Sequence, residues 1–134
     1  MKKTLTGLFF LVSVLLSITA CDTAFTVGSK TIGIRSGGFI YSDGHLRATY
    51  TFPFEQVWSA CEKAIADMKA TDVERIKKIS EGNLTAMIQD EKVRIQVTYV
   101  DKENTMVAVM AGTTGNTLAS QLIHDRIITI LRKP

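Results

Sequence analysis

The chain has 134 residues, of which 16 are basic and 13 acidic, so its net charge is only +3. This balance argues against nucleic acid as a partner, because nucleic-acid-binding domains carry a clustered excess of Lys and Arg. The length is typical of one domain that buries about two thirds of its surface without help from disulfides or metals.

The first twenty residues have the pattern of an export signal. Lys2 and Lys3 form a short positive start, and Leu8–Leu16 is apolar except for Ser13. This apolar run is too short to span a bilayer, which takes about 20 residues, but it matches the apolar region of a secretory signal. Residues 1–20 are therefore predicted to be a signal peptide that is removed after export.

The signal ends in a motif that resembles the bacterial lipobox, because Ile18, Thr19 and Ala20 precede Cys21. The resemblance implies cleavage between Ala20 and Cys21, a diacylglycerol on the Cys21 sulfur, and an acyl chain such as palmitate on the new amine. Two or three fatty chains hold a protein stably on a membrane. Asp22 resembles an inner-membrane retention signal, with the outer membrane as the alternative. The other interpretations are a plain signal peptide or a buried N-terminal helix, with Cys21 incidental in both.

Removal of the leader leaves 14 basic and 13 acidic residues. If Cys21 carries lipid, Cys61 has no internal partner, and burial would protect it from an oxidising periplasm. Residues 21–37 are predicted to be the lipidated cysteine and a short tether, with one edge strand near Thr31–Arg35 as an alternative. The tether reaches at most about 55 Å. Residues 38–134 are predicted to form the single domain.

A hairpin and a helix open this domain. Asp43-Gly44 lies between two β-prone runs, which is a strong hairpin signal, and apolar residues alternate with polar ones from His45 to Phe52. A helix is then expected to start at Pro53, placed in its first turn. Its apolar stripe follows the helical spacing: Phe54, Val57, Trp58, Cys61, Ala64, Ile65 and Met68.

The next segments predict an antiparallel meander and a second helix. Residues 72–79 are ambiguous, because Thr71 and Glu74 have capping-box spacing while the following run suits a hairpin partner for residues 84–89. Residues 92–100 alternate as a clear strand, and residues 105–111 suit a strand buried on both faces. Asn116 or Thr117 then caps a helix over 118–131, with Leu122, Ile123, Ile127 and Ile130 apolar.

The order of hairpin, helix, meander and helix predicts an α+β fold. We expect a two-layer sandwich in which an antiparallel sheet carries both helices on one face.

Four segments together resemble an uncharacterised family of small bacterial lipoproteins, a domain of unknown function. They are "YSDGHL", "YTFPFEQVWSACEKAI", "GNLTAMIQDEKVRIQV" and "AGTTGNTLASQLIHDRI", and the match spans residues 38–131. The shared features include Gly44-x-Leu46, Val57-Trp58, Val93-x-Ile95, and Gly115 followed by Ser120. The resemblance favours a strand over 72–79, and it implies no particular activity.

No set of residues in the sequence predicts catalysis, a metal or a cofactor. His45 and His124 are not part of any zinc-ligand spacing and are expected at the surface. Ser120 and His124 share a helix face, but a hydrolytic triad also needs an orienting acid and an oxyanion hole. The Gly112–Asn116 loop lacks the residues of a phosphate-binding loop and is interpreted as a turn and a cap.

Two functional hypotheses follow. The first is a non-enzymatic envelope module, held on the membrane lipid through Cys21, facing the periplasm, and presenting a surface to a periplasmic protein or the cell wall. The second is a ligand-binding or enzymatic domain with a site in a sheet–helix crevice. The candidate surface residues are His45, Arg94, Tyr99, Gly115 and Asn116. A deep pocket with converging polar groups would favour the second hypothesis.

Overall fold

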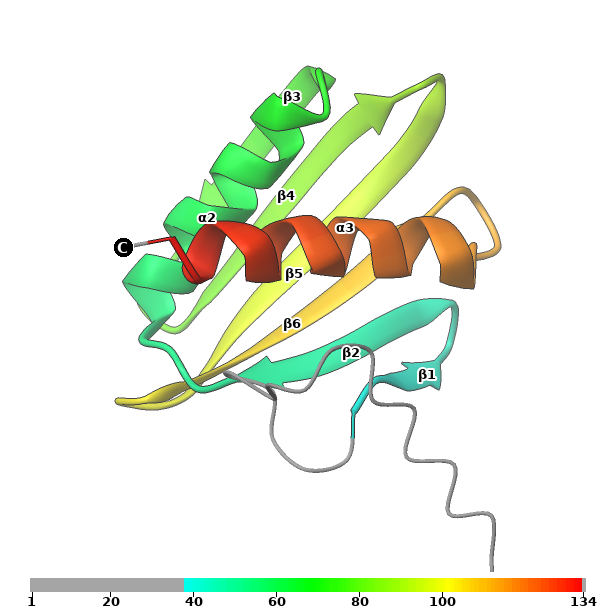
Figure 1. Ribbon diagram of the computed structural model, residues 1–134. Helices are drawn as coiled ribbons and strands as arrows, with labels where there is room; N and C mark the ends of the chain where they lie inside the picture. The colour runs from blue at the N-terminus through cyan, green and yellow to red at the C-terminus, as the bar shows by residue number, and fades with distance from the viewer. Residues whose placement is uncertain (1–37, 134) are drawn as a thin grey trace, which may run out of the picture.

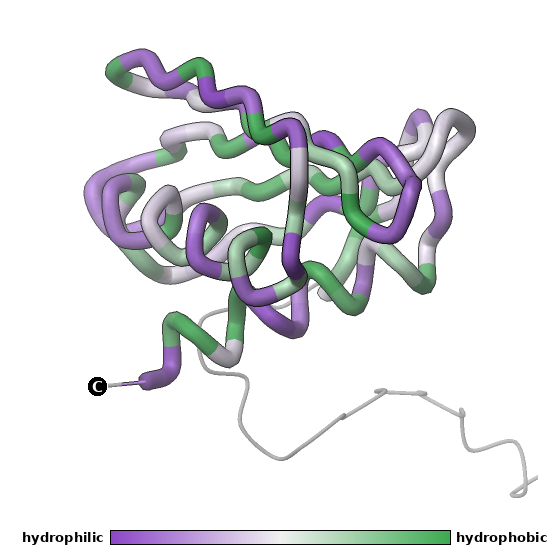
Figure 2. Tube along the Cα trace, turned by 90° about the horizontal axis from the view of Figure 1, so that it is seen from above, coloured by the Kyte–Doolittle hydropathy of each residue, from purple (hydrophilic) through white to green (hydrophobic). Residues whose placement is uncertain are grey.

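The computed structural model describes residues 38–133, which form a six-stranded antiparallel sheet and two helices (Figure 1). The elements in chain order are β1 (Ile40–Ser42), β2 (His45–Tyr50), α2 (Phe54–Asp67), β3 (Thr71–Lys77), β4 (Glu81–Ile88), β5 (Glu91–Asp101), β6 (Asn104–Ala111) and α3 (Thr117–Leu131). Both helices lie on one face of the sheet, as the view from above also shows (Figure 2). The predicted α+β sandwich is confirmed. The predictions for residues 1–37 lie outside the described residues.

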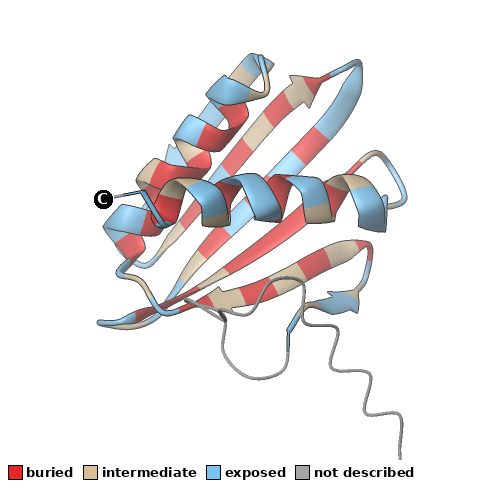
Figure 3. Ribbon diagram, viewed as in Figure 1, coloured by how far each residue is buried: buried red, intermediate tan, exposed pale blue. Residues whose placement is uncertain are grey.

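The sheet has the strand order β1-β2-β6-β5-β4-β3, with every neighbouring pair antiparallel. The last strand of the meander, β6, returns beside β2 and so lies in the interior of the sheet. Almost every residue of β6 is buried, as predicted, whereas β4 and β5 alternate between buried and exposed residues (Figure 3). The apolar core lies between this alternating face and the two helices.

The β1–β2 hairpin turns at Asp43 and Gly44, as predicted. Both residues have positive φ, 53° and 77°, and Ser42 pairs with His45 across the two-residue loop. This geometry matches the right-handed twist of the flanking strands, and glycine adopts it without steric cost. Gly115 packs against the same turn, because a Cβ there would lie 2.4 Å from the Gly44 carbonyl oxygen.

The helix α2 begins one residue later than the sequence indicates. Pro53 is the extended N-cap residue, and its carbonyl accepts the first helical bond from the Val57 amide (3.1 Å). The predicted apolar stripe is buried from Phe54 to Ile65, including Cys61 at 0% exposure, whereas Met68 is only partly buried. Trp58 packs over Gly82 of β4, where a Cβ would lie 2.2 Å from the indole ring. The glycine therefore sets how closely α2 approaches the sheet.

The ambiguous segment is the edge strand β3, which pairs with β4. Its register shifts between Thr71 and Glu74, and Asp72 has a φ of 50°. This edge strand is exposed along most of its length, and Ile76 is 50% exposed, so its apolar residues do not mark one buried face.

The helix α3 starts at Thr117, with Asn116 as the cap. The Asn116 side chain accepts a hydrogen bond from the Ala119 amide (3.0 Å), as predicted for one of the two candidate caps. Its buried face is Ser120, Ile123, His124, Ile127 and Leu131, whereas Leu122 is 56% exposed. The helix is thus rotated so that a histidine, and not Leu122, faces the sheet.

Candidate functional site: a polar hollow on the open face of the sheet

The sheet has one face that no helix of the described residues covers, and we call it the open face. Strand alternation places on it His45, Arg47 and Thr49 of β2, Asn83, Thr85 and Met87 of β4, Arg94, Gln96 and Thr98 of β5, and Met106, Ala108 and Met110 of β6. Most of these side chains are polar, because a sheet that packs on one side only can carry polar groups on the other.

A shallow hollow of about 220 Å³ lies on this face. Leu84 and Ile95 form part of its lining. The rest consists of polar residues from three strands: His45, Asn83, Thr85, Arg94 and Gln96. The strand register explains the grouping, since Thr85 pairs with Arg94 and Asn83 pairs with Gln96. The structure therefore brings together two of the predicted surface residues, His45 and Arg94.

His45 is held in place by the hairpin turn that precedes it. Its ring Nδ1 lies 2.9 Å from the Asp43 carbonyl oxygen. A carbonyl can only accept, so Nδ1 carries the proton and donates it. In the neutral ring Nε2 then has only a lone pair to offer. His45 thus lines the hollow with its Nδ1 committed to the hairpin turn.

The β6 side chains on the open face lie between residues of β2 and β5 and are largely buried. Met110 pairs with Arg94, and continuing the β2 register places His45 on its other side. Ala108 lies between Arg47 and Gln96 in the same way. Met110 is only 9% exposed and Ala108 only 1%, although no described helix covers them. The burial of Met110 comes in part from the hairpin turn, since its methyl group packs against Gly44.

The other predicted surface residues lie apart from the hollow. Tyr99 continues the alternation that buries Val97, so it is on the side of β5 opposite Arg94. Its amide donates to the Ser80 carbonyl (2.8 Å), next to Ile79, which is 99% exposed. Tyr99 therefore lies near the tip of the β3–β4 hairpin and away from the hollow.

Gly115 and Asn116 have structural roles at the start of α3. Gly115 contacts the Gly44 turn, one residue before His45, and Asn116 caps the helix. The predicted sites at Ala20, Cys21 and Asp22 lie outside the described residues.

His124 is part of a buried hydrogen-bond network. The prediction that it lies at the surface is therefore wrong. His124 is 0% exposed. Its Nε2 lies 2.8 Å from the Leu46 carbonyl oxygen and must donate to it, so Nδ1 accepts from the Tyr50 hydroxyl (2.5 Å). Burial lowers the pKa of His124 to about 4 and raises that of Tyr50 well above its usual value.

This network leaves no proton acceptor for Ser120. Both ring nitrogens of His124 are already engaged, and the buried Ser120 hydroxyl has no hydrogen-bond partner among the described residues. The two side chains do share a helix face, as their spacing indicates. They do not form a nucleophile–base pair, because neither reaches solvent.

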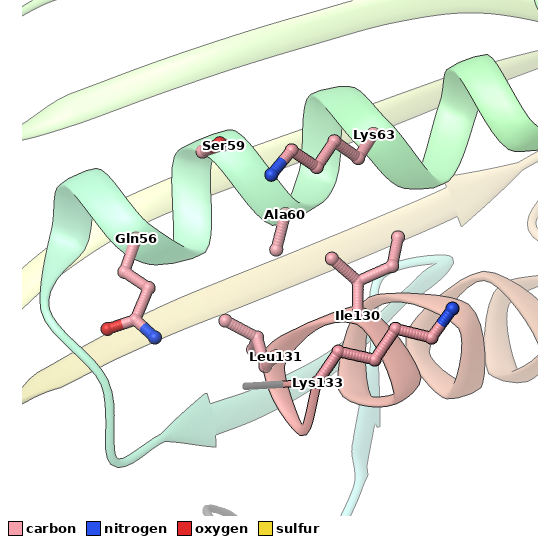
Figure 4. Close-up of a pocket in the computed structure, with 7 residues that line it drawn as sticks. All are labelled: Gln56, Ser59, Ala60, Lys63, Ile130, Leu131 and Lys133. Atoms are coloured by element: carbon pink, nitrogen blue, oxygen red, sulfur yellow. The ribbon is translucent and has the colours of Figure 1, made fainter.

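A second hollow, of about 200 Å³, lies between α2 and the C-terminal end of α3 (Figure 4). Its lining residues are Gln56, Ser59, Ala60, Lys63, Ile130, Leu131 and Lys133. The ammonium groups of Lys63 and Lys133 point in different directions, so they do not converge on a common point (Figure 4). The first hollow is therefore the better candidate for a binding site.

Residues 38–133 contain no cluster of side chains that suits metal binding or thiol chemistry. No group of three His, Cys, Asp or Glu side chains in this range could hold a metal ion. Cys61 is a free thiol, buried as predicted, and burial raises its pKa above the usual value.

The burial of His124 predicts that the protein loses stability at acid pH. The pKa of His124 is about 4 in the folded state and about 6.5 when exposed, so the unfolded chain takes the proton first. The contribution of this group to stability is complete above pH 6.5. It is lost as the pH falls toward about 4, by about 3 kcal/mol in total.

Denaturant unfolding followed by Trp58 fluorescence at several pH values measures this loss. The variant His124→Gln should be less stable at neutral pH and should lack most of the pH dependence in this window, whereas His45→Gln should retain it. Equal slopes for His124→Gln and the wild-type protein would contradict the assignment.

Comparison with known proteins gives a family and no activity. Comparison with curated proteins found no match. Among solved structures, the chain is similar to the vertebrate conserved region of human METTL16, with 22% identity and a TM-score of 0.41 over 58% of this chain and 74% of that chain. A likeness this distant does not bear on function. The model of a family described as a protein of unknown function (DUF3568) matches residues 3–129, and the chain belongs to that family.

Proposed function

We propose that the protein is a lipid-anchored envelope module that faces the periplasm and binds a partner through the open face of its sheet. The partner is a periplasmic protein or a component of the cell wall. The observation that carries the proposal is the asymmetry of the sandwich: one sheet face is packed by both helices, while the other presents polar side chains from three strands, β2, β4 and β5.

The lipid anchor is supported by the sequence. Cys21 follows an aliphatic residue and two small residues behind a basic and apolar leader, as in the bacterial lipobox. No helix within residues 38–133 has the length and apolarity to cross a membrane. A tether from Cys21 to residue 37 would keep the domain within about 55 Å of the bilayer. Asp22 favours the inner membrane, with the outer membrane as the alternative.

The charges of the domain support a protein or glycan partner in preference to nucleic acid. The basic residues of the β3 edge are each paired with a carboxylate: Arg75 with Glu62 (3.1 Å), Lys77 with Glu55 (2.5 Å) and Lys78 with Glu81 (2.9 Å). A surface for phosphodiester backbones needs clustered basic side chains that are free to contact phosphates.

A non-catalytic role is supported by the burial of one histidine and one cysteine, residue types that often act in catalysis. The imidazole of His124 is used for core hydrogen bonds, and the Cys61 thiol is buried.

The alternative function, a small-ligand-binding or enzymatic domain, is favoured by the hollow around Arg94. Its volume of about 220 Å³ lies below the roughly 300–1,000 Å³ of typical ligand pockets.

The lipid anchor predicts selective acylation of one of the two cysteines. Labelling of cells with an alkyne-tagged palmitate should mark the wild-type protein and Cys61→Ala, while Cys21→Ser should remain unlabelled and keep its leader. Mass spectrometry of the wild-type protein should show an N-terminus at residue 21 with attached fatty chains. Unmodified Cys21 in the mature protein would contradict the anchor.

The open face predicts a partner that contacts one side of the domain. A photoreactive amino acid at Gln96, which is exposed on the open face, should give a discrete crosslinked product in living cells. The same group at Arg126, exposed on α3, is the matched control and should not give this product. Identical products from both positions, or none from Gln96, would count against the open face as the docking surface.

A further inference from the structure

The hollow on the open face combines one cation with neutral hydrogen-bond donors. Arg94 lines it together with Asn83, Thr85 and Gln96, and no Asp or Glu is among the lining residues. Guanidinium, amide and hydroxyl groups can all donate hydrogen bonds to one acceptor. The lining is therefore suited to a group that accepts several hydrogen bonds and carries negative charge.

Arg94 differs from the paired cations of the β3 edge, since no ion pair within residues 38–133 involves it. The nearest carboxylate in its row of the sheet is Glu74, which pairs with Thr85 on the far side from Arg94. Two strand spacings, about 9.6 Å, separate the two backbones. Lys92 lies on the same face of β5, two residues before Arg94, and adds positive charge. The hollow thus has a net positive environment.

We propose that this hollow binds a small oxyanion, a carboxylate or phosphate group borne by the partner. This proposal rests on the assignment of the open face to a partner and names the chemistry that the partner presents. Arg94 supplies the charge and a planar pair of donors that matches a carboxylate or phosphate. His45 lies at the border of the hollow, with its Nδ1 bound to the Asp43 carbonyl oxygen.

The size of the hollow sets the size of the group. A volume of about 220 Å³ admits one such group with its ordered water, but it is too small for a nucleotide or another cofactor of drug-like size. On a surface that binds a larger partner, the group that enters the hollow is therefore one acidic group of that partner.

Met110 provides a local probe of this site, because it pairs directly with Arg94 on the open face. The mature protein, purified from membranes in a non-ionic detergent with methyl-labelled methionine, is titrated with inorganic phosphate and, separately, with acetate. Sodium chloride at matched ionic strength is the control for screening. Met68, which packs against the core on the helix side, reports on the fold.

We expect a saturable shift of the Met110 methyl resonance with at least one oxyanion and no such shift with chloride. Arg94→Gln should weaken the binding about ten-fold or more, the effect of losing a charge-assisted hydrogen bond. Lys92→Gln, on the same strand and face, should weaken it by less. Tighter binding of phosphate than acetate would assign the partner group to phosphate, and the reverse to carboxylate.

Two results would overturn the oxyanion site: the absence of saturation with both anions, or equal binding by Arg94→Gln and the wild-type protein. An unchanged Met68 resonance shows that the variants are folded, so neither result can be ascribed to misfolding. Crosslinking from the open face is independent of this titration. A partner captured there without oxyanion binding would refute the oxyanion site and leave the docking surface standing.

Discussion

A single buried imidazole fixes how α3 lies on the sheet. His124 of α3 donates to a backbone carbonyl of β2 and accepts from the Tyr50 hydroxyl of the same strand. Each hydrogen bond satisfies a polar group that would otherwise be costly to bury. Because these bonds are directional, they specify the rotation of α3 about its axis and its position over β2, which apolar packing alone would define less sharply.

The helix α2 is positioned by close packing of an aromatic ring on a glycine. The Trp58 ring of α2 lies over Gly82, a point where the sheet has no side chain, and Lys77 lies 5.9 Å from the centre of the same ring. Ion pairs from α2 to β3 cover the edge of this contact. With both helices held on one side, the polar residues of β2, β4 and β5 are left together on the other. The open face and its hollow follow from how the core is closed.

Sequence patterns predict the fold where a local signal is sufficient. Asp43-Gly44 specifies the first hairpin, and the alternation in residues 92–100 specifies β5, because both depend on neighbouring residues alone. The ambiguity of β3 has a physical cause, since this edge strand is exposed along most of its length and no buried face imposes an apolar alternation. Pro53 was placed one position too far into the helix, because its fixed φ suits both the N-cap and the first turn.

The candidate site was predicted only in part, because it depends on contacts between distant segments. His45 and Arg94 were singled out, but strand order is needed to place them on one hollow and to separate them from Tyr99. His124 was expected at the surface because its partners lie 74 and 78 residues away in the chain. Ser120, Ile123, His124 and Ile127 do have the spacing of one helix face, and that spacing was the signal for burial.

The protonation state of His124 tests this account most directly. Nitrogen-15 NMR of the imidazole distinguishes the two neutral tautomers and the charged ring. We predict a neutral ring protonated at Nε2 at neutral pH, persisting to about one pH unit above its pKa of about 4. A charged ring at neutral pH, or a proton on Nδ1, would contradict the hydrogen bonds that hold α3 on the sheet.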